Sequence, residues 1–117
     1  MGNPLCHFEL SVSDPEKSQA FYENVFDWKF SHDRSMDYTM INPGGEPMGG
    51  MMKKPDQAPG FSLSVYFCVD SLDETIAKVQ AAGGTVAVPK TEIQGMGFWA
   101  LFLDPDGIPV GVYESSK

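Results

Sequence analysis

Residues 7–16 read HFELSVSDPE, and this stretch decides the fold. Its first six residues alternate between polar and apolar side chains, which is typical of a strand with one buried face. Asp14 then offers a helix N-cap, and Pro15 suits the first helical position. The stretch therefore predicts a strand that leads directly into a helix.

The same arrangement returns in the second half of the chain. Residues 64–74 read SVYFCVDSLDE, which is again an alternating strand. Ser71 and Glu74 have the spacing of a capping box, and the helix that they start is expected to end at Gly83. An internal repeat of this kind indicates two copies of one structural unit.

Three further strands are expected in each half. They are residues 28–31, 38–41 and 48–52, then 85–88, 98–103 and 110–113. The last two strands of each half are joined by matching turns, NPGG at 42–45 and DPDG at 104–107. Aligning the halves on these turns pairs Gly49 with Gly111. Residues 89–97 are expected to form a long loop, a candidate lid whose Lys90 could meet an anionic group.

The predicted fold is α+β, with two βαβββ modules in one domain that spans residues 1–117. Module 1 covers about residues 4–53, a linker covers 54–61, and module 2 covers about 62–115. The helix of each module covers one face of its sheet and leaves the other face bare. Two bare faces are expected to meet in a cup-shaped, partly open mixed β-barrel.

Composition excludes some classes of partner. The chain has 117 residues, with 16 acidic and 8 basic side chains and a net charge of -8. Such a charge repels phosphate backbones and anionic lipids, so we expect neither nucleic acid nor membrane as a partner. There is no signal peptide pattern, and Cys6 and Cys68 are expected to lie on opposite faces without a disulfide. A cytoplasmic location is predicted.

These motifs resemble the vicinal oxygen chelate superfamily, which includes glyoxalase I, bleomycin-resistance proteins, methylmalonyl-CoA epimerase and extradiol dioxygenases. The likeness rests on the paired modules, on HFELSVSDP at 7–15 and VDSLD at 69–73, and on DPDG at 104–107. Residues 89–97, PKTEIQGMG, are similar to a small glyoxalase-like group. The resemblance implies a glyoxalase-like fold, a small-molecule ligand and a homodimer.

The resemblance also implies four metal-ligand positions, on the first and last strands of each module. In this chain they hold His7, Gly49, Ser64 and Gly111. Glycine has no side-chain ligand and serine is a poor one, so we predict no metal and no cofactor. His32 is expected near a rim, and Glu114 is expected on the face opposite Gly111.

Alternation predicts which side chains face the cup. Phe8 and Leu10 are expected under the helix, so His7 and Glu9 face the other way, with Cβ atoms about 6–7 Å apart. The predicted ligand-binding residues are His7, Glu9, Gly49, Met51, Ser64, Tyr66, Gly111 and Tyr113. The two glycines should leave open space. His7 and Glu9 are also the candidate catalytic residues, since a partly buried carboxylate with a raised pKa can act as a general base.

Three functions stay open at this stage. The first is a metal-independent binder of a small molecule, of the bleomycin-resistance type, because an acidic chain suits a cationic or neutral aromatic ligand. The second is a lyase or isomerase of the glyoxalase I type that uses His7 and Glu9 for proton transfer. The third is an assembly module with a vestigial cup. The sequence names no substrate and does not decide whether the protein is an enzyme.

Overall fold

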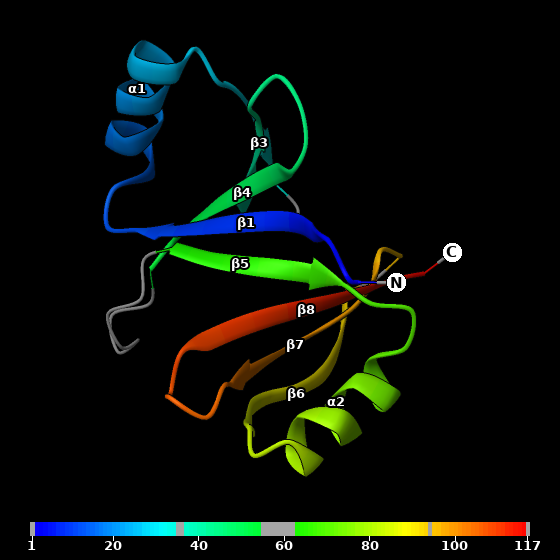
Figure 1. Cartoon of the computed structure of the whole chain (residues 1–117). Coiled ribbons are helices and arrows are strands. Elements are labelled where there is room, and N and C mark those ends of the chain that lie inside the picture. The colour runs from blue at the N-terminus through cyan, green and yellow to red at the C-terminus, as the bar shows by residue number, and fades with distance from the viewer. Residues whose placement is uncertain (1, 35–36, 55–62, 94, 117) are drawn as a thin grey trace. The chain divides into compact units, whose positions relative to one another are not determined.

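The computed structural model of the chain describes residues 2–34, 37–54, 63–93 and 95–116. It divides into two compact units, which we call the first unit (residues 6–64) and the second unit (residues 1–5 and 65–117). Each unit has the element order β-α-β-β-β (Figure 1). The predicted α+β class and the two βαβββ modules are therefore confirmed.

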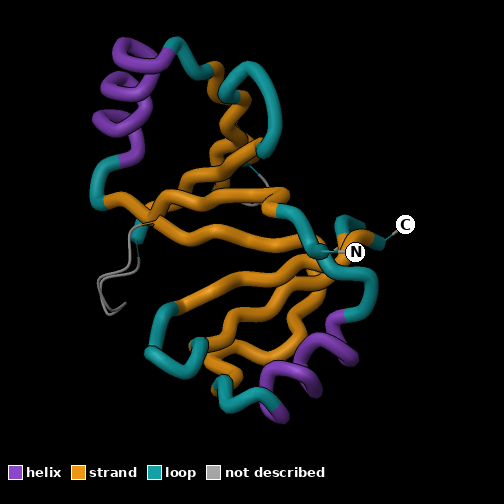
Figure 2. Tube along the Cα trace, viewed as in Figure 1, coloured by secondary structure: helices purple, strands orange, loops and turns teal. Residues whose placement is uncertain are grey.

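The first unit places one helix against four strands (Figure 2). Its elements are β1 (Leu5–Val12), α1 (Pro15–Phe26), β2 (Lys29–Asp33), β3 (Tyr38–Asn42) and β4 (Met48–Lys53). The strand order is β2-β3-β4-β1. The first strand, β1, runs parallel to β4, and the other two pairs are antiparallel.

The second unit repeats this topology. Its elements are β5 (Leu63–Cys68), α2 (Leu72–Ala81), β6 (Thr85–Ile93), β7 (Gly97–Leu103) and β8 (Pro109–Ser115). The strand order is β6-β7-β8-β5, and β5 runs parallel to β8. The first strand of each unit thus lies beside the last, as a crossover through a helix requires.

Both helices begin where the sequence predicts. Asp14 caps α1 by accepting the backbone N–H of Lys17 at 3.3 Å, and Pro15 is the first helical residue. Ser71 caps α2 by accepting the N–H of Glu74 at 3.2 Å. These bonds satisfy N–H groups that have no partner inside the helix.

Each unit has its own apolar core on the side of the sheet that its helix covers. The first core holds Leu10, Ile41 and Met51. The second holds Leu72, Ala100 and Val112, each at most 3% exposed. Because the strand residues of these cores alternate with residues of the other face, the cores fix which side chains each bare face presents.

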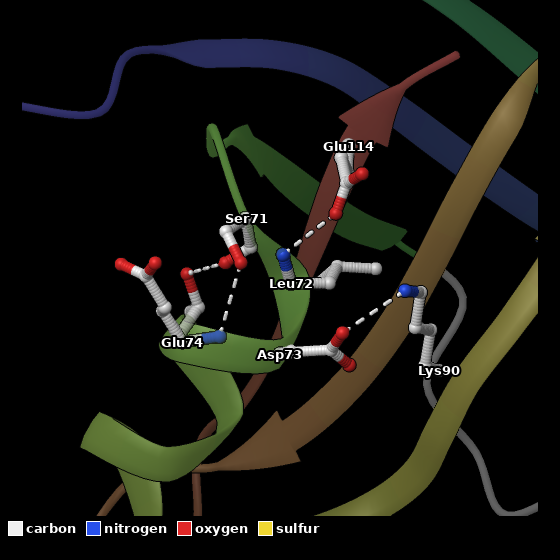
Figure 3. Close-up of polar contacts among 7 residues, drawn as sticks. Ser71, Leu72, Asp73, Glu74, Lys90 and Glu114 are labelled. Carbon is white, nitrogen blue, oxygen red and sulfur yellow. Dashed lines mark hydrogen bonds and ion pairs between the residues drawn. The ribbon is translucent and has the colours of Figure 1, made fainter.

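Glu114 lies on the helix side of β8, as the alternation predicts. Its Oε1 accepts the backbone N–H of Leu72 at 2.8 Å (Figure 3). Leu72 is the first residue of α2, so this carboxylate meets the positive end of the helix dipole. Glu114 therefore has a structural role in tying β8 to the start of α2.

The prediction of a loop at residues 89–97 is wrong. The strand β6 continues to Ile93, and its ladder with β7 pairs Thr91 with Trp99. Pro89 had indicated the end of the strand, but the ladder shifts register between Val88 and Thr91, which accommodates a residue without an N–H. Lys90, which was expected to meet an anionic group of a ligand, makes an ion pair with Asp73 at 3.3 Å.

The expectation for the cysteines is also wrong. Both Cys6 and Cys68 are disulfide-bonded. The carbonyl of Pro4 accepts the N–H of Cys68 at 2.9 Å, so the chain just before Cys6 runs beside Cys68, which alternation within each half does not reveal. The cysteines thus give no support for a reducing compartment.

Two other expectations concern the linker and the membrane. The predicted linker, residues 54–61, lies outside the described residues apart from Lys54. Within the described part of the chain, neither helix has the length and apolar character needed to cross a membrane.

Replacing Glu114 should destabilise the protein. We expect Glu114→Ala to lower the free energy of unfolding by about 1–2 kcal/mol, because a charge-assisted hydrogen bond to a helix start is lost. Glu114→Gln keeps an acceptor and should cost less. Glu92→Ala, at an exposed position of β6, is the control and should change stability by no more than about 0.5 kcal/mol. Urea denaturation measures all three, and equal effects of Glu114→Ala and Glu92→Ala would contradict this role.

Candidate functional site

The register between β1 and β4 decides which residues share a face with His7. Phe8 lies opposite Gly49, and Glu9 lies opposite Gly50. Since Phe8 packs against the core under α1, Gly49 is also on the helix side. His7, Glu9 and Gly50 therefore belong to the bare face of the first unit.

The facing predicted for Gly49 and Met51 is consequently wrong. A Cβ atom at Gly49 would lie 2.3 Å from the Phe8 ring, and Met51 is a core residue with 1% exposure. The error comes from aligning the two turns. The turn residue Asn42 is still part of β3, whereas its counterpart Asp104 follows the end of β7. The residue that corresponds to Gly111 is therefore Gly50.

A tyrosine joins the two predicted catalytic residues on the bare face. The hydroxyl oxygen of Tyr38 lies 3.1 Å from Nε2 of His7, and the hydroxyl donates to Oε2 of Glu9 at 3.0 Å. We call this set the His7–Tyr38–Glu9 relay. It brings His7 and Glu9 together as predicted, but through a residue that sequence reasoning did not select.

Gly50 makes the relay possible. A Cβ atom built at Gly50 would lie 1.6 Å from the hydroxyl of Tyr38, so only glycine admits the phenol at this height above the sheet. Tyr38 begins β3, which neighbours β4. The pair of glycines at 49–50, next to a strand that begins with tyrosine, was the available signal.

The protons of the relay have one consistent arrangement. With Glu9 ionised, the hydroxyl proton of Tyr38 goes to its carboxylate, and the tautomer of His7 that carries its proton on Nε2 donates to the phenol oxygen. Burial lowers the pKa of His7 below its ordinary value, because the charged imidazolium loses hydration. His7 is therefore neutral at pH 7. The hydroxyl of Tyr38 donates to the carboxylate of Glu9, which is the acceptor at the end of the relay.

The second unit presents an aromatic bare face. Tyr66 lies opposite Gly111, and its ring would be 2.4 Å from a Cβ atom there. Trp99 packs edge-on against Tyr66, with ring centroids 6.3 Å apart. Tyr113 is two residues beyond Gly111 on the same face and donates its hydroxyl to the carbonyl of Met96.

The open space expected at the predicted glycines is therefore filled by aromatic rings. Phe8 covers Gly49, and Tyr66 covers Gly111. Ser64 alternates with Tyr66 along β5 and so shares its face, as predicted. The cup expected between the modules remains a prediction.

The described residues do not fit the metal that the resemblance implies. His7 and Glu9 are two potential ligands, but among the described residues no group of three His, Cys, Asp or Glu side chains could hold a metal ion. A divalent metal in a protein site takes three or more such ligands. We therefore derive no chemical step through a metal.

Comparison with known proteins identifies the family. Residues 5–112 match the model of the Glyoxalase/Bleomycin resistance protein/Dioxygenase superfamily. The chain is 34% identical over 102 residues to "Putative glyoxylase CFP32" of Mycobacterium tuberculosis, which covers 85% of this chain and 39% of that protein. It thus spans less than half the length of this curated relative. The chain belongs to the glyoxalase/bleomycin resistance protein/dioxygenase superfamily.

Solved structures share the fold. The hypothetical protein BH1468 from Bacillus halodurans superposes with a TM-score of 0.78 at 16% identity, covering 100% of this chain and 97% of that one. Methylmalonyl-CoA epimerase from Streptomyces coelicolor, in complex with 2-nitronate-propionyl-CoA, superposes with a TM-score of 0.71 at 12% identity. That match covers 97% of both chains.

The lowered pKa of His7 predicts how stability depends on pH. Between that pKa and about 6.5 the unfolded chain binds more protons than the folded protein. The free energy of unfolding should therefore fall as the pH drops through this window, and His7→Gln should remove that slope. An NMR titration of the imidazole signals, assigned with His32→Gln, measures the pKa directly. A value for His7 at or above 6.5 would contradict the burial of its ring.

Proposed function

We propose that this member of the superfamily binds a small organic molecule on the bare face of its first unit, without a metal ion. The observation that carries the proposal is the His7–Tyr38–Glu9 relay. Three half-buried polar side chains from two strands converge there above a glycine. A scaffold needs no such group for stability, because buried polar side chains lose hydration and only partly regain it through mutual hydrogen bonds.

The relay favours ligands that donate hydrogen bonds. It ends at the carboxylate of Glu9, which in its ionised form only accepts. The net charge of -8 also disfavours anions. A neutral or cationic molecule with an O–H or N–H group is therefore the best match for this face.

The comparisons agree with a small-molecule ligand in general terms. The Streptomyces coelicolor epimerase, which shares the fold, was solved with a small ligand bound. The relative from Mycobacterium tuberculosis has the name "Putative glyoxylase CFP32", and the match covers only 39% of its length. The activity of a whole protein of that kind is therefore only proposed for this chain, as is the homodimer that the family resemblance implies.

Three matched probes test the ligand class. Phenol carries a donor on an aromatic ring, anisole has no donor, and benzoate is anionic. We expect phenol at millimolar concentration to shift the NMR signals of His7, Tyr38 and Gly50 in a saturable manner, and anisole and benzoate to bind at least about fivefold more weakly. Fivefold is the discrimination expected from one hydrogen bond of roughly 1 kcal/mol.

Variants separate the relay from general aromatic packing. Tyr38→Phe should weaken the preference for phenol over anisole, because it removes the hydroxyl that holds the carboxylate of Glu9 in position to accept the hydrogen bond of the ligand. Tyr22→Phe is the matched control, since Tyr22 packs on α1 against Phe26 and Trp28, on the helix side of the sheet. Equal responses of the two variants, or no preference for phenol in the natural protein, would refute the proposal.

The same relay supports a second candidate, a lyase or isomerase that moves a proton. The carboxylate of Glu9 could take a proton from a hydroxyl-bearing carbon next to a carbonyl group and return it to the former carbonyl carbon, while the hydroxyl proton moves to the former carbonyl oxygen. Tyr38 and His7 are hydrogen-bonded in series with that carboxylate, so they could adjust its charge during the transfer. Glu9 would then be the catalytic residue, and Tyr38 would position it.

The glyoxalase reaction checks this candidate against metal-dependent chemistry. With methylglyoxal and glutathione, we expect added Ni²⁺ or Zn²⁺ to produce no strong turnover, because the described residues lack a three-ligand group. A metal contributes several kcal/mol to such reactions, so its loss lowers the rate by powers of ten. Strong metal-dependent turnover that His7→Ala abolishes would overturn the metal-free account.

A further inference from the structure

A separate cavity of about 290 Å³ lies in the first unit, between the start of α1 and strands β2, β3 and β4. Its lining includes Met51 and Thr39, which face α1 according to the strand register. The His7–Tyr38–Glu9 relay belongs to the opposite face of the same sheet. The cavity is therefore distinct from the site proposed above.

In the second unit, the positions that correspond to part of this lining belong to the buried core cluster. With Gly50 matched to Gly111, Met51 corresponds to Val112 and Thr39 to Ala100. The first helical residues, Pro15 and Leu72, also correspond. In the second unit these positions make up the buried cluster of Leu72, Ala100 and Val112.

Two contacts close the second unit at this point (Figure 3). Glu114 accepts the N–H of Leu72, and Leu72 itself is 0% exposed. Lys90 bridges to Asp73 and lies 4.5 Å from the centre of the Phe98 ring. The end of β8, the start of α2 and strands β6 and β7 are thus held together.

The first unit lacks the residues that make these contacts. Pro15 has no N–H to donate, and it is shorter than leucine. Lys53 occupies the position of Glu114, and Asp37 occupies that of Phe98. The cavity is therefore a direct consequence of sequence differences between the two repeats.

Part of the lining is polar where the corresponding position of the other unit is apolar, as with Thr39 and Ala100. Thr39 is 6% exposed, and its hydroxyl is 3.0 Å from Nδ1 of His32. His32 in turn approaches Asp37, with 3.7 Å between Nε2 and Oδ1. The set of Thr39, His32 and Asp37 is not needed to pack the core. Polar side chains at positions where the repeat has apolar ones are expected at functional sites.

We propose that this cavity is a second ligand site, which takes a small organic cation such as a primary amine on a short apolar body. The carboxylates of Glu16 and Asp37 line it against one ammonium group, that of Lys53. Pro15 offers apolar surface to the body of the ligand, and Met51, a core residue with 1% exposure, forms part of the cavity floor. The volume equals that of roughly ten water molecules, which suits a molecule of this size.

Benzylamine is the probe that tests this site, with benzyl alcohol as its neutral counterpart. We expect benzylamine to shift the NMR signals of Thr39, Met51 and Lys53 in a saturable manner, and benzyl alcohol to bind at least about fivefold more weakly. Tyr38→Phe should leave this binding unchanged, which separates it from the relay. The absence of saturable binding, or shifts centred on His7 instead, would overturn the proposal.

The chain offers a matched pair of aspartates as a control. Asp37 and Asp27 both have positive φ, 50° and 58°, and their side chains are 92% and 89% exposed. Asp37→Asn should weaken benzylamine binding about fivefold, whereas Asp27→Asn, at the far end of α1, should not change it. Equal effects of the two variants would mean that only the general negative charge attracts the amine, which refutes the site.

A second variant closes the cavity itself. Pro15→Leu introduces the residue that the second unit has at this position, with both its side chain and its N–H. We expect it to abolish benzylamine binding while the protein remains folded, as shown by an otherwise unchanged NMR spectrum. If Pro15→Leu is folded and still binds benzylamine as the natural protein does, the cavity is not the site.

Discussion

The contact between a tyrosine hydroxyl and a bare glycine backbone holds the proposed site together. Tyr38 can reach His7 and Glu9 only because no Cβ atom stands at position 50. That contact allows the three side chains to meet, and burial lowers the pKa of His7. The register of β1 and β4 places Gly50 beside Glu9, and the absence of a side chain at Gly50 allows Tyr38 to bond to Glu9 and His7.

The two repeats use the same scaffold in opposite ways. On the bare face, both place a tyrosine over a glycine of the last strand, but Tyr66 comes from the first strand and Tyr38 from the third. On the helix face, the second unit buries Leu72 beside Glu114, whereas the first unit has a cavity with a mixed polar and apolar lining. The first unit therefore carries both proposed sites.

The sequence predicted what depends on local pattern. Alternation, capping residues and turn signals were sufficient for the two βαβββ modules, for the start of each helix and for the facing of Glu114. The sequence did not predict the features that depend on how neighbouring strands pair. A shift of one residue in β4 exchanges Gly49 for Gly50 and moves it to the other face. Tyr38 and the ladder of β6 beyond Pro89 likewise depend on partners that periodicity does not reveal.

The most direct test of this account is the Gly50→Ala variant, observed through the NMR signals of the Tyr38 ring and the His7 imidazole. Gly45→Ala is the control, because a Cβ atom there has nothing within 4 Å. We expect Gly50→Ala to displace Tyr38 and change both sets of signals, and Gly45→Ala to leave them as they are. If Gly50→Ala folds with the Tyr38 and His7 signals unchanged, the hydroxyl does not lie over this glycine and the relay is not formed as described.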